Sequence, residues 1–188
     1  MSSSAGSPLP VRIAAGQYAL LPEIARTRRE ENLRFLRMIQ SVPSERFDRV
    51  ALPIAQEQTE RIDCTLCANC CRSVQPGVLP EELPVLARCA HMEVTSFSRQ
   101  WVKKEAGTGI AYLHRLPCLF LQENRCSIYN DRPLSCRDYP HLQHPGLKFR
   151  LRSLISQYSV CPIVFNTLEA LKEAFGFSAT ASPNEEKK

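Results

Sequence analysis

Apolar residues recur at helical spacing along the first third of the chain. They begin just after Pro22 and Glu23 and continue from Ile24 to Ile39. A proline at the first helical position, with an acidic residue beside it, is typical of a helix start. The pattern predicts a helix over residues 22–39, with a solvated face of interleaved arginine and glutamate.

The same spacing returns further along the chain. A second helical pattern covers residues 47–62, where Pro53 is expected to bend or restart the helix. Further apolar patterns of this period predict helices over residues 80–91, 96–105 and 162–176.

Shorter apolar runs point to a different structure in the second half. Residues 117–121 and 126–129 flank a polar stretch at 122–125, which predicts a short β-hairpin with a polar turn. Residues 147–160 are expected to be extended or mixed. The whole pattern predicts an α+β fold, mainly helical with a short β-hairpin.

Composition and charge exclude several classes of protein. The 188 residues carry a formal charge of +5, spread among interleaved basic and acidic side chains, so nucleic-acid binding is not expected. No apolar run is long enough for a membrane span, and residues 1–17 lack the apolar stretch of a signal peptide. The nine cysteines are an odd number, which does not suit a full set of disulfides. We therefore expect a cytoplasmic protein with reduced thiols and no membrane partner.

Four of those cysteines lie within eight residues. They are Cys64, Cys67, Cys70 and Cys71, and two of the intervals are C-x2-C. Disulfides that close such short loops gain little stability, whereas C-x2-C lets a tight turn direct two sulfurs at one metal. This stretch predicts a metal site.

The remaining thiols leave the kind of metal open. A zinc site usually has two C-x2-C pairs, and here the second pair is missing. The C-x2-C-x2-C loop with remote cysteines instead favours an iron–sulfur cluster over zinc.

Cys70 and Cys71 are expected to point apart on an extended backbone, towards two metals or towards one metal and the core. Cys89 is expected to be a small buried residue, and His141 is the best auxiliary ligand among the histidines.

Known catalytic motifs do not indicate an enzymatic activity for this sequence. The sequence contains no G-x-S-x-G, no glycine-rich phosphate loop and no H-E-x-x-H, and its seven glycines do not favour a dinucleotide pocket. An enzymatic role therefore stays open, either as an iron–sulfur oxidoreductase or as an accessory metal domain.

The cysteine motifs resemble those of the YkgJ-like cysteine-cluster proteins, which are described as zinc- or iron-chelating domains. The resemblance rests on C-x2-C-x2-C-C and on the run C-S-I-Y-x2-R-P-x2-C-R that begins at Cys126, and it covers about residues 60–165. It implies a metal-binding set that leaves out Cys89. That set is Cys64, Cys67, Cys70, Cys71, Cys118, Cys126, Cys136 and Cys161. Some relatives are called iron–sulfur oxidoreductases, and a flagellin lysine N-methylase carries a similar domain. We do not infer a methylase activity for this chain from that relative, because residues 1–60 show no cofactor pocket.

The sequence thus predicts four parts. They are a flexible tail at 1–20, a helical arm at 21–60 packed on the core, a small cysteine-rich metal-binding domain at 61–177 and a disordered tail at 178–188. One hypothesis is a protein with an iron–sulfur cluster for redox or electron-transfer chemistry. The alternative is a zinc-binding structural or interaction module, with the helical arm as the surface for a protein partner.

Overall fold

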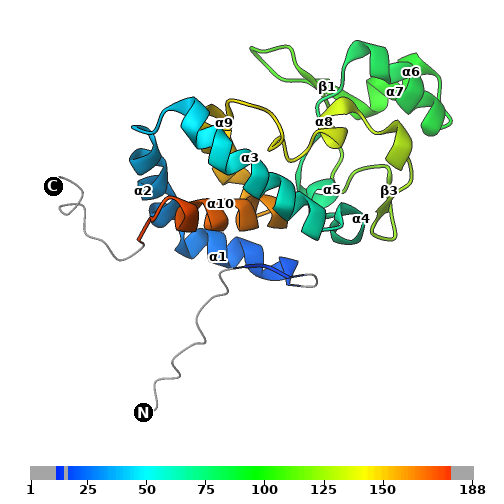
Figure 1. Ribbon diagram of the computed structural model, residues 1–188. Helices are drawn as coiled ribbons and strands as arrows, with labels where there is room; N and C mark the ends of the chain where they lie inside the picture. The colour runs from blue at the N-terminus through cyan, green and yellow to red at the C-terminus, as the bar shows by residue number, and fades with distance from the viewer. Residues whose placement is uncertain (1–11, 15–16, 179–188) are drawn as a thin grey trace. The chain divides into compact units, whose positions relative to one another are not determined.

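The protein is described by a computed structural model that covers residues 12–14 and 17–178 (Figure 1). The chain divides into two compact units. The helical unit contains residues 1–62 and 142–188, and the cysteine unit contains Asp63–His141. The secondary structure is mainly helical with short antiparallel hairpins, which confirms the predicted fold class. None of the helices in the described ranges is long and apolar enough to cross a membrane.

The helical unit is built around its last helix. Its helices are η1 (Tyr18–Leu20), α1 (Leu21–Thr27), α2 (Arg29–Ile39), α3 (Ser44–Arg61), α9 (Leu147–Gln157) and α10 (Pro162–Ala174). α10 packs along α3, and α9 contacts α2, α3 and α10. Residues on all sides of α10 are buried, as expected for a helix at the centre of a core.

Two predictions for this unit were only partly right, and a third was wrong. The helix expected over 22–39 is interrupted at Arg28, whose backbone leaves the helical region while its side chain binds Glu169. α3 continues through Pro53 and does not restart there. The segment expected to be extended or mixed is the helix α9, because the carboxylate of Asp48 accepts hydrogen bonds from the N–H groups of Gly146 and Leu147 at its start.

The tail predicted at 1–20 differs from the structure where it is described. Ile13 is 3% exposed and forms two backbone hydrogen bonds with the Asn166 side chain, so this part of the predicted tail is attached to the unit. Phe177, the last residue before the tail predicted at 178–188, lies edge-on to Phe35, with ring centroids 5.6 Å apart. The rest of the predicted tails, at 1–11, 15–16 and 179–188, lies outside the described residues.

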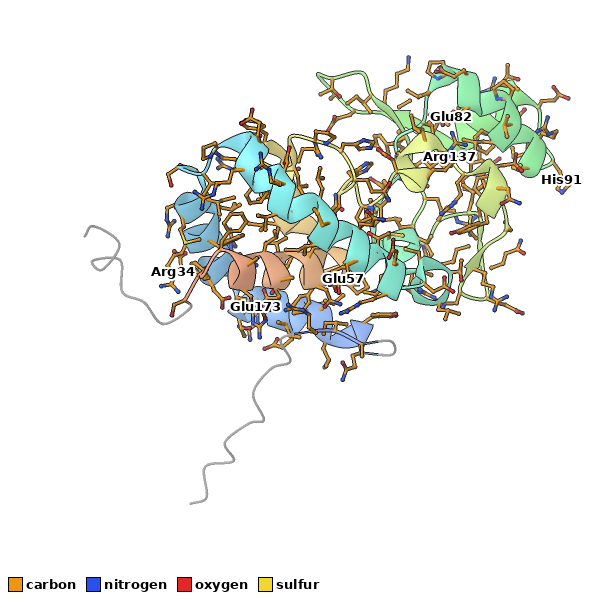
Figure 2. The ribbon with its side chains drawn as sticks, in the orientation of Figure 1. Arg34, Glu57, Glu82, His91, Arg137 and Glu173 are labelled. Atoms are coloured by element: carbon orange, nitrogen blue, oxygen red, sulfur yellow. The ribbon has the colours of Figure 1, made fainter. Side chains whose placement is uncertain are left out.

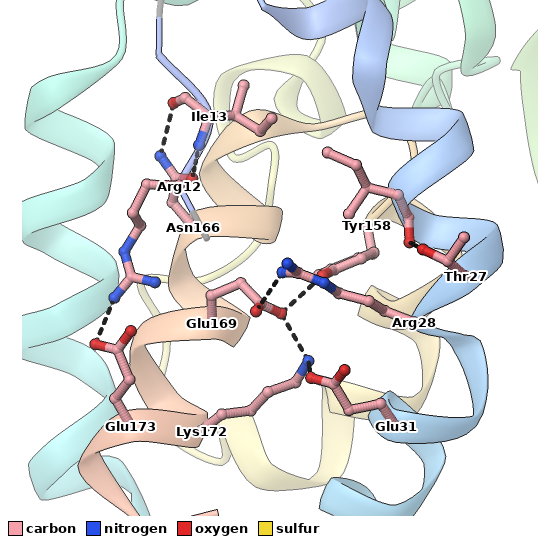
Figure 3. A network of polar contacts seen from close by, with 11 residues as sticks. Arg12, Ile13, Thr27, Arg28, Glu31, Tyr158, Asn166, Glu169, Lys172 and Glu173 are labelled. Carbon is pink, nitrogen blue, oxygen red and sulfur yellow. Dashed lines mark hydrogen bonds and ion pairs between the residues drawn. The ribbon is translucent and has the colours of Figure 1, made fainter. Parts of the chain in front are cut away.

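A buried ionic network joins α10 to the rest of the helical unit (Figure 3). The Glu169 carboxylate accepts hydrogen bonds from Arg28, Tyr158 and Lys172, at 2.6–2.7 Å. Lys172 also pairs with Glu31 at 2.6 Å. Two cations therefore face two anions, which offsets the cost of removing these charges from water.

The cysteine unit contains short elements around a small core. They are α4 (Cys64–Cys67), α5 (Asn69–Ser73), η2 (Pro80–Glu82), α6 (Leu83–Cys89), α7 (Val94–Trp101), β1 (Val102–Lys104), β2 (Ala111–Leu113), β3 (Leu121–Gln122), β4 (Arg125–Cys126), η3 (Tyr129–Asp131) and α8 (Leu134–Arg137). Its core residues are Val78, Leu86, Ala87, Phe97, Leu113, Phe120 and Ile128.

One prediction for this unit was right and one was partly wrong. The predicted hairpin is present as β3 and β4, with Leu121 opposite Cys126. The helix expected over 96–105 ends at Trp101, and the next residues form β1, which pairs with β2. Gly107 and Gly109 have φ of +92° and +71° in the connection, a backbone that glycine adopts easily, so the chain can reverse there.

The extent of the cysteine-cluster domain stays a prediction. The sequence suggested 61–177, whereas the compact unit that contains the cysteine motif ends at His141. Residues 147–174 form α9 and α10, which pack with α3 in the helical unit.

Candidate metal centre

The CxxCxxCC stretch forms two short helical turns. Asp63 begins the first turn, since its carboxylate accepts hydrogen bonds from the N–H and hydroxyl of Thr65 at 2.8 and 2.6 Å. Ala68, with a left-handed φ of 51°, separates α4 from α5. We call residues 63–73 the CxxC loop.

Cys70 and Cys71 are closer than expected. Both lie on α5, where consecutive side chains are about 100° apart, and not on the extended backbone that would point them in opposite directions. Their Sγ atoms are 4.0 Å apart, so one thiol can donate a hydrogen bond to the other. The prediction that these two side chains point apart was therefore wrong.

The β3–β4 hairpin brings two more cysteines to the CxxC loop. The N–H of Cys118 donates to the carbonyl of Cys71 at 2.8 Å. β4, which includes Cys126, packs against α4. Cys118 and Cys126 are half-buried and also contact the core of the unit.

A third segment, α8, carries Cys136. The Glu82 carboxylate accepts hydrogen bonds from the N–H groups of Leu79 and Leu134, at 2.8 and 2.6 Å, and so ties η2 to the start of α8. The Ser135 hydroxyl donates to the carbonyl of Gly77 at 2.7 Å. Figure 2 labels Glu82, and Arg137 at the end of α8. These contacts hold Cys136 in place through its neighbours.

Electrostatic coupling shows that the three segments share one environment. The pKa of Cys136 is raised to about 12, mainly by burial and further by Cys118, Cys71 and Cys126. Burial also raises the pKa of several other thiols, and in each case the charge of Cys71 adds to the effect. Those thiols are Cys64, Cys67, Cys118 and Cys126.

Cys71 is the exception among these thiols. A hydrogen bond from Cys70 lowers its pKa to about 7, with help from Arg72 and Arg132 and against the effect of burial. Cys71 therefore ionises more readily near neutral pH than these other thiols, and only a thiolate is a good metal ligand.

Arg132 supplies positive charge to the cluster. It favours the thiolates of Cys64, Cys71 and Cys126. Its Nε donates to the carbonyl of Tyr129 at 2.7 Å, and its Cζ lies 3.5 Å from the centroid of the Tyr129 ring. The guanidinium is thus fixed by a residue of the same turn, and it can balance the charge of metal-bound thiolates.

Seven of the eight predicted ligands lie in the cysteine unit, and the eighth lies in the helical unit. The seven, none of which is in a disulfide, are Cys64, Cys67, Cys70, Cys71, Cys118, Cys126 and Cys136. Cys161 belongs to the helical unit, where it is 5% exposed at the start of α10, so its role as a ligand stays a prediction. His141 contacts the carboxylate of Asp138 at 3.4 Å. Cys89 packs on the core of the cysteine unit, and its charge also acts on Cys126.

The donor set suits a metal that prefers sulfur. Partly buried free thiols and a nearby cation are the chemistry expected of a thiolate site. Among the described residues, no three Cys, His, Asp or Glu side chains stand ready to hold one ion. Cysteine binds metal as the thiolate, so metal binding releases the protons of the thiols that ligate it.

Comparison with known proteins places the chain in a family. The family model CxxCxxCC, described as "putative zinc- or iron-chelating domain", matches residues 63–162, and the chain belongs to this family. The predicted resemblance to cysteine-cluster proteins described as zinc- or iron-chelating domains is thereby confirmed, and the match supports metal binding. Searches of curated proteins and of solved structures gave no match.

Some residues that build this site carried no signal in the sequence. Glu82 and Asn124 bind segments 52 and 58 residues away along the chain, and no spacing rule predicts such contacts. Arg132 precedes Cys136 by four residues, but that spacing does not predict that its guanidinium acts on the thiols. Its stacking on Tyr129 is visible only in the structure.

Proposed function

We propose that the cysteine unit holds an iron–sulfur cluster on its thiolates and that the protein takes part in redox or electron-transfer chemistry. The observation that supports this is the meeting of the CxxC loop and the cysteine hairpin, where the N–H of Cys118 donates to the carbonyl of Cys71 and β4, with Cys126, packs against α4. The description of the matched family as a zinc- or iron-chelating domain supports a site for one of these metals.

The arrangement of thiols favours iron over zinc. One zinc ion is complete with four ligands, whereas the unit gathers seven predicted ligands, three of them at C-x2-C-x2-C spacing as in iron–sulfur loops. The cluster, when bound, supplies one-electron chemistry.

The protein residues control charge and solvent at the cluster. Cys71 offers the first thiolate near neutral pH, since its pKa is about 7. Arg132 offsets part of the negative charge that the ligands introduce, and partial burial of the thiols other than the exposed Cys64 limits access of water. Charge and solvent exposure are the means by which a protein sets the reduction potential of such a cluster.

Metal and sulfide analysis of anaerobically purified protein tests this proposal. We expect a brown protein with visible charge-transfer absorbance, and with iron and acid-labile sulfide in equal amounts. A colourless protein with stoichiometric zinc and no sulfide would refute the redox function.

A second candidate is a zinc-stabilised interaction module. It is supported by the small elements of the cysteine unit, whose strands have two or three residues and whose helices α4, α5 and α8 have four or five. A unit built from elements this short needs an additional source of stability, and a structural metal ion commonly supplies it. In that case zinc removal unfolds the unit, and the protein shows no reversible reduction.

A further inference from the structure

Two side chains join the turn of the β3–β4 hairpin to the CxxC loop. The amide of Asn124 donates to the carbonyl of Leu66 at 2.9 Å and accepts from Arg72 at 2.6 Å. Arg72 also donates to the carbonyl of Cys67 at 3.4 Å. We call these three hydrogen bonds the Asn124–Arg72 clasp.

Asn124 suits this place for two reasons. Its φ is +74° and that of Glu123 is +42°, a turn in which asparagine is better tolerated than most side chains. Its amide is a donor and an acceptor at once, and the clasp uses both. Glycine would fit the backbone without the clasp, and aspartate could accept from Arg72 but could not donate to Leu66.

The clasp attaches the hairpin to the loop at the turn. At the opposite end of the hairpin, the N–H of Cys118 donates to the carbonyl of Cys71, and β4 packs against α4. With both in place, Cys126 on β4 is held against α4. Without the clasp, the hairpin can pivot about the Cys118 end, and Cys126 moves relative to the CxxC loop.

We propose that Asn124 and Arg72 are positioning residues of the metal centre, which hold the hairpin cysteines against the CxxC loop before metal binds. Neither residue supplies a sulfur, so each acts through the ligands. A metal binds only the fraction of molecules in which its ligands can meet, so loss of the clasp lowers the apparent affinity. The inference rests on the proposed thiolate centre and holds for iron or zinc alike.

Titration of the reduced full-length chain with Co²⁺ tests the clasp. Thiolate-to-cobalt absorbance reports sulfur ligation directly, and competition with a chelator gives the affinity. We expect Asn124→Gly to weaken Co²⁺ binding about 10- to 100-fold, as is typical when a partner of metal ligands is removed. Glu123→Gln, in the same turn but outside the clasp, is the matched control and should stay within about 2-fold.

A second variant and a second readout separate positioning from folding. Arg72→Lys keeps the positive charge beside Cys67 and Cys71 but lacks the forked guanidinium, and it should weaken binding in the same direction. The thermal midpoint of the metal-free variants should stay close to that of the wild type. If Asn124→Gly does not fold, the Co²⁺ affinity of Arg72→Lys, compared with the wild type and with Glu123→Gln, tests the positioning role instead.

The outcomes are distinct. Wild-type affinity in both variants would overturn the positioning role while leaving the proposed function intact. Failure of the wild-type chain to bind Co²⁺ through sulfur would instead overturn the proposed thiolate centre and the clasp with it.

Discussion

Individual cysteines in the cysteine unit differ in what surrounds them, and their substitutions should differ accordingly. Cys67 lies on the CxxC loop and Cys126 on the hairpin, each coupled to Cys71. We predict that Cys67→Ser or Cys126→Ser lowers the metal content per chain and destabilises the loaded protein. Elemental analysis and thermal unfolding of the purified variants measure both effects.

Cys89 is the control within the same unit. It packs on the apolar core, so Cys89→Ala should leave the metal content unchanged. Loss of metal in this variant would show that Cys89 is a ligand, and normal metal content in the Cys67 or Cys126 variants would refute their assignment.

The buried network on α10 makes a separate prediction about stability. Glu169 is 5% exposed and holds the side chains of Arg28 and Lys172 (Figure 3). Glu169→Gln removes the carboxylate charge with which Arg28 pairs, while Lys172 keeps its pair with Glu31. Breaking a buried ion pair is costly, so we expect the free energy of unfolding to fall by about 3–5 kcal/mol.

The exposed ion pair nearby gives a matched comparison. Glu173 on the same helix pairs with Arg12 at 2.8 Å, and its side chain is 62% exposed. Glu173→Gln should cost less than about 1 kcal/mol in urea unfolding. If Glu169→Gln and Glu173→Gln lower the free energy of unfolding equally, burial is not what makes the Glu169 network important for stability.

At the level of elements, the start of α9 depends on a residue from α3. Asp48 binds the N–H groups of Gly146 and Leu147, and so caps the helix from a distance of about 100 residues along the chain. Asp48→Ala should lower the free energy of unfolding by about 1 kcal/mol, and Asp48→Asn should lose less because its amide oxygen still accepts. Chemical denaturation followed by circular dichroism measures the difference, and an unchanged midpoint in Asp48→Ala would refute the cap.

The elements that the sequence predicted well are those with local signals. The final helix has apolar residues at helical spacing and Cys161-Pro162 at its start, and the β3–β4 hairpin has a polar turn between apolar runs. α9 has no capping side chain of its own at Gly146, and its cap comes from Asp48, so its sequence gave no start signal. The break at Arg28 follows from a long-range bond to Glu169, which no local pattern reveals.

In the candidate site, too, features with local sequence signals were predictable and features that depend on long-range contacts were not. Clustered cysteines indicate a metal site because ligand spacing is local, and the family match agrees. The polar contacts of Asn124 and Glu82 join distant segments, so only the folded chain reveals them.

For the whole molecule, the thiols predict how the stability of the metal-free protein changes with pH. Burial raises the pKa of most cluster thiols above the ordinary 9.0, up to about 12 for Cys136, so the folded state keeps protons that the unfolded state loses. Their contribution is complete below about pH 9 and is lost as the pH rises towards 12. Cys71 acts in the opposite direction, because its pKa of about 7 stabilises the folded state as the pH rises from 7 to 9.

Urea unfolding of the reduced, metal-free chain across this range measures the effect. We expect stability to be highest near pH 9 and to fall at higher pH. Stability that keeps rising above pH 10 would contradict the burial of these thiols.

The central claim of this account is that cysteine thiolates hold the metal. X-ray absorption at the metal edge of anaerobically purified protein tests it directly. We predict a first shell of sulfur atoms, at about 2.3 Å if the metal is zinc. A first shell of oxygen and nitrogen alone, or a chain without metal whose cysteines are paired as disulfides, would contradict it.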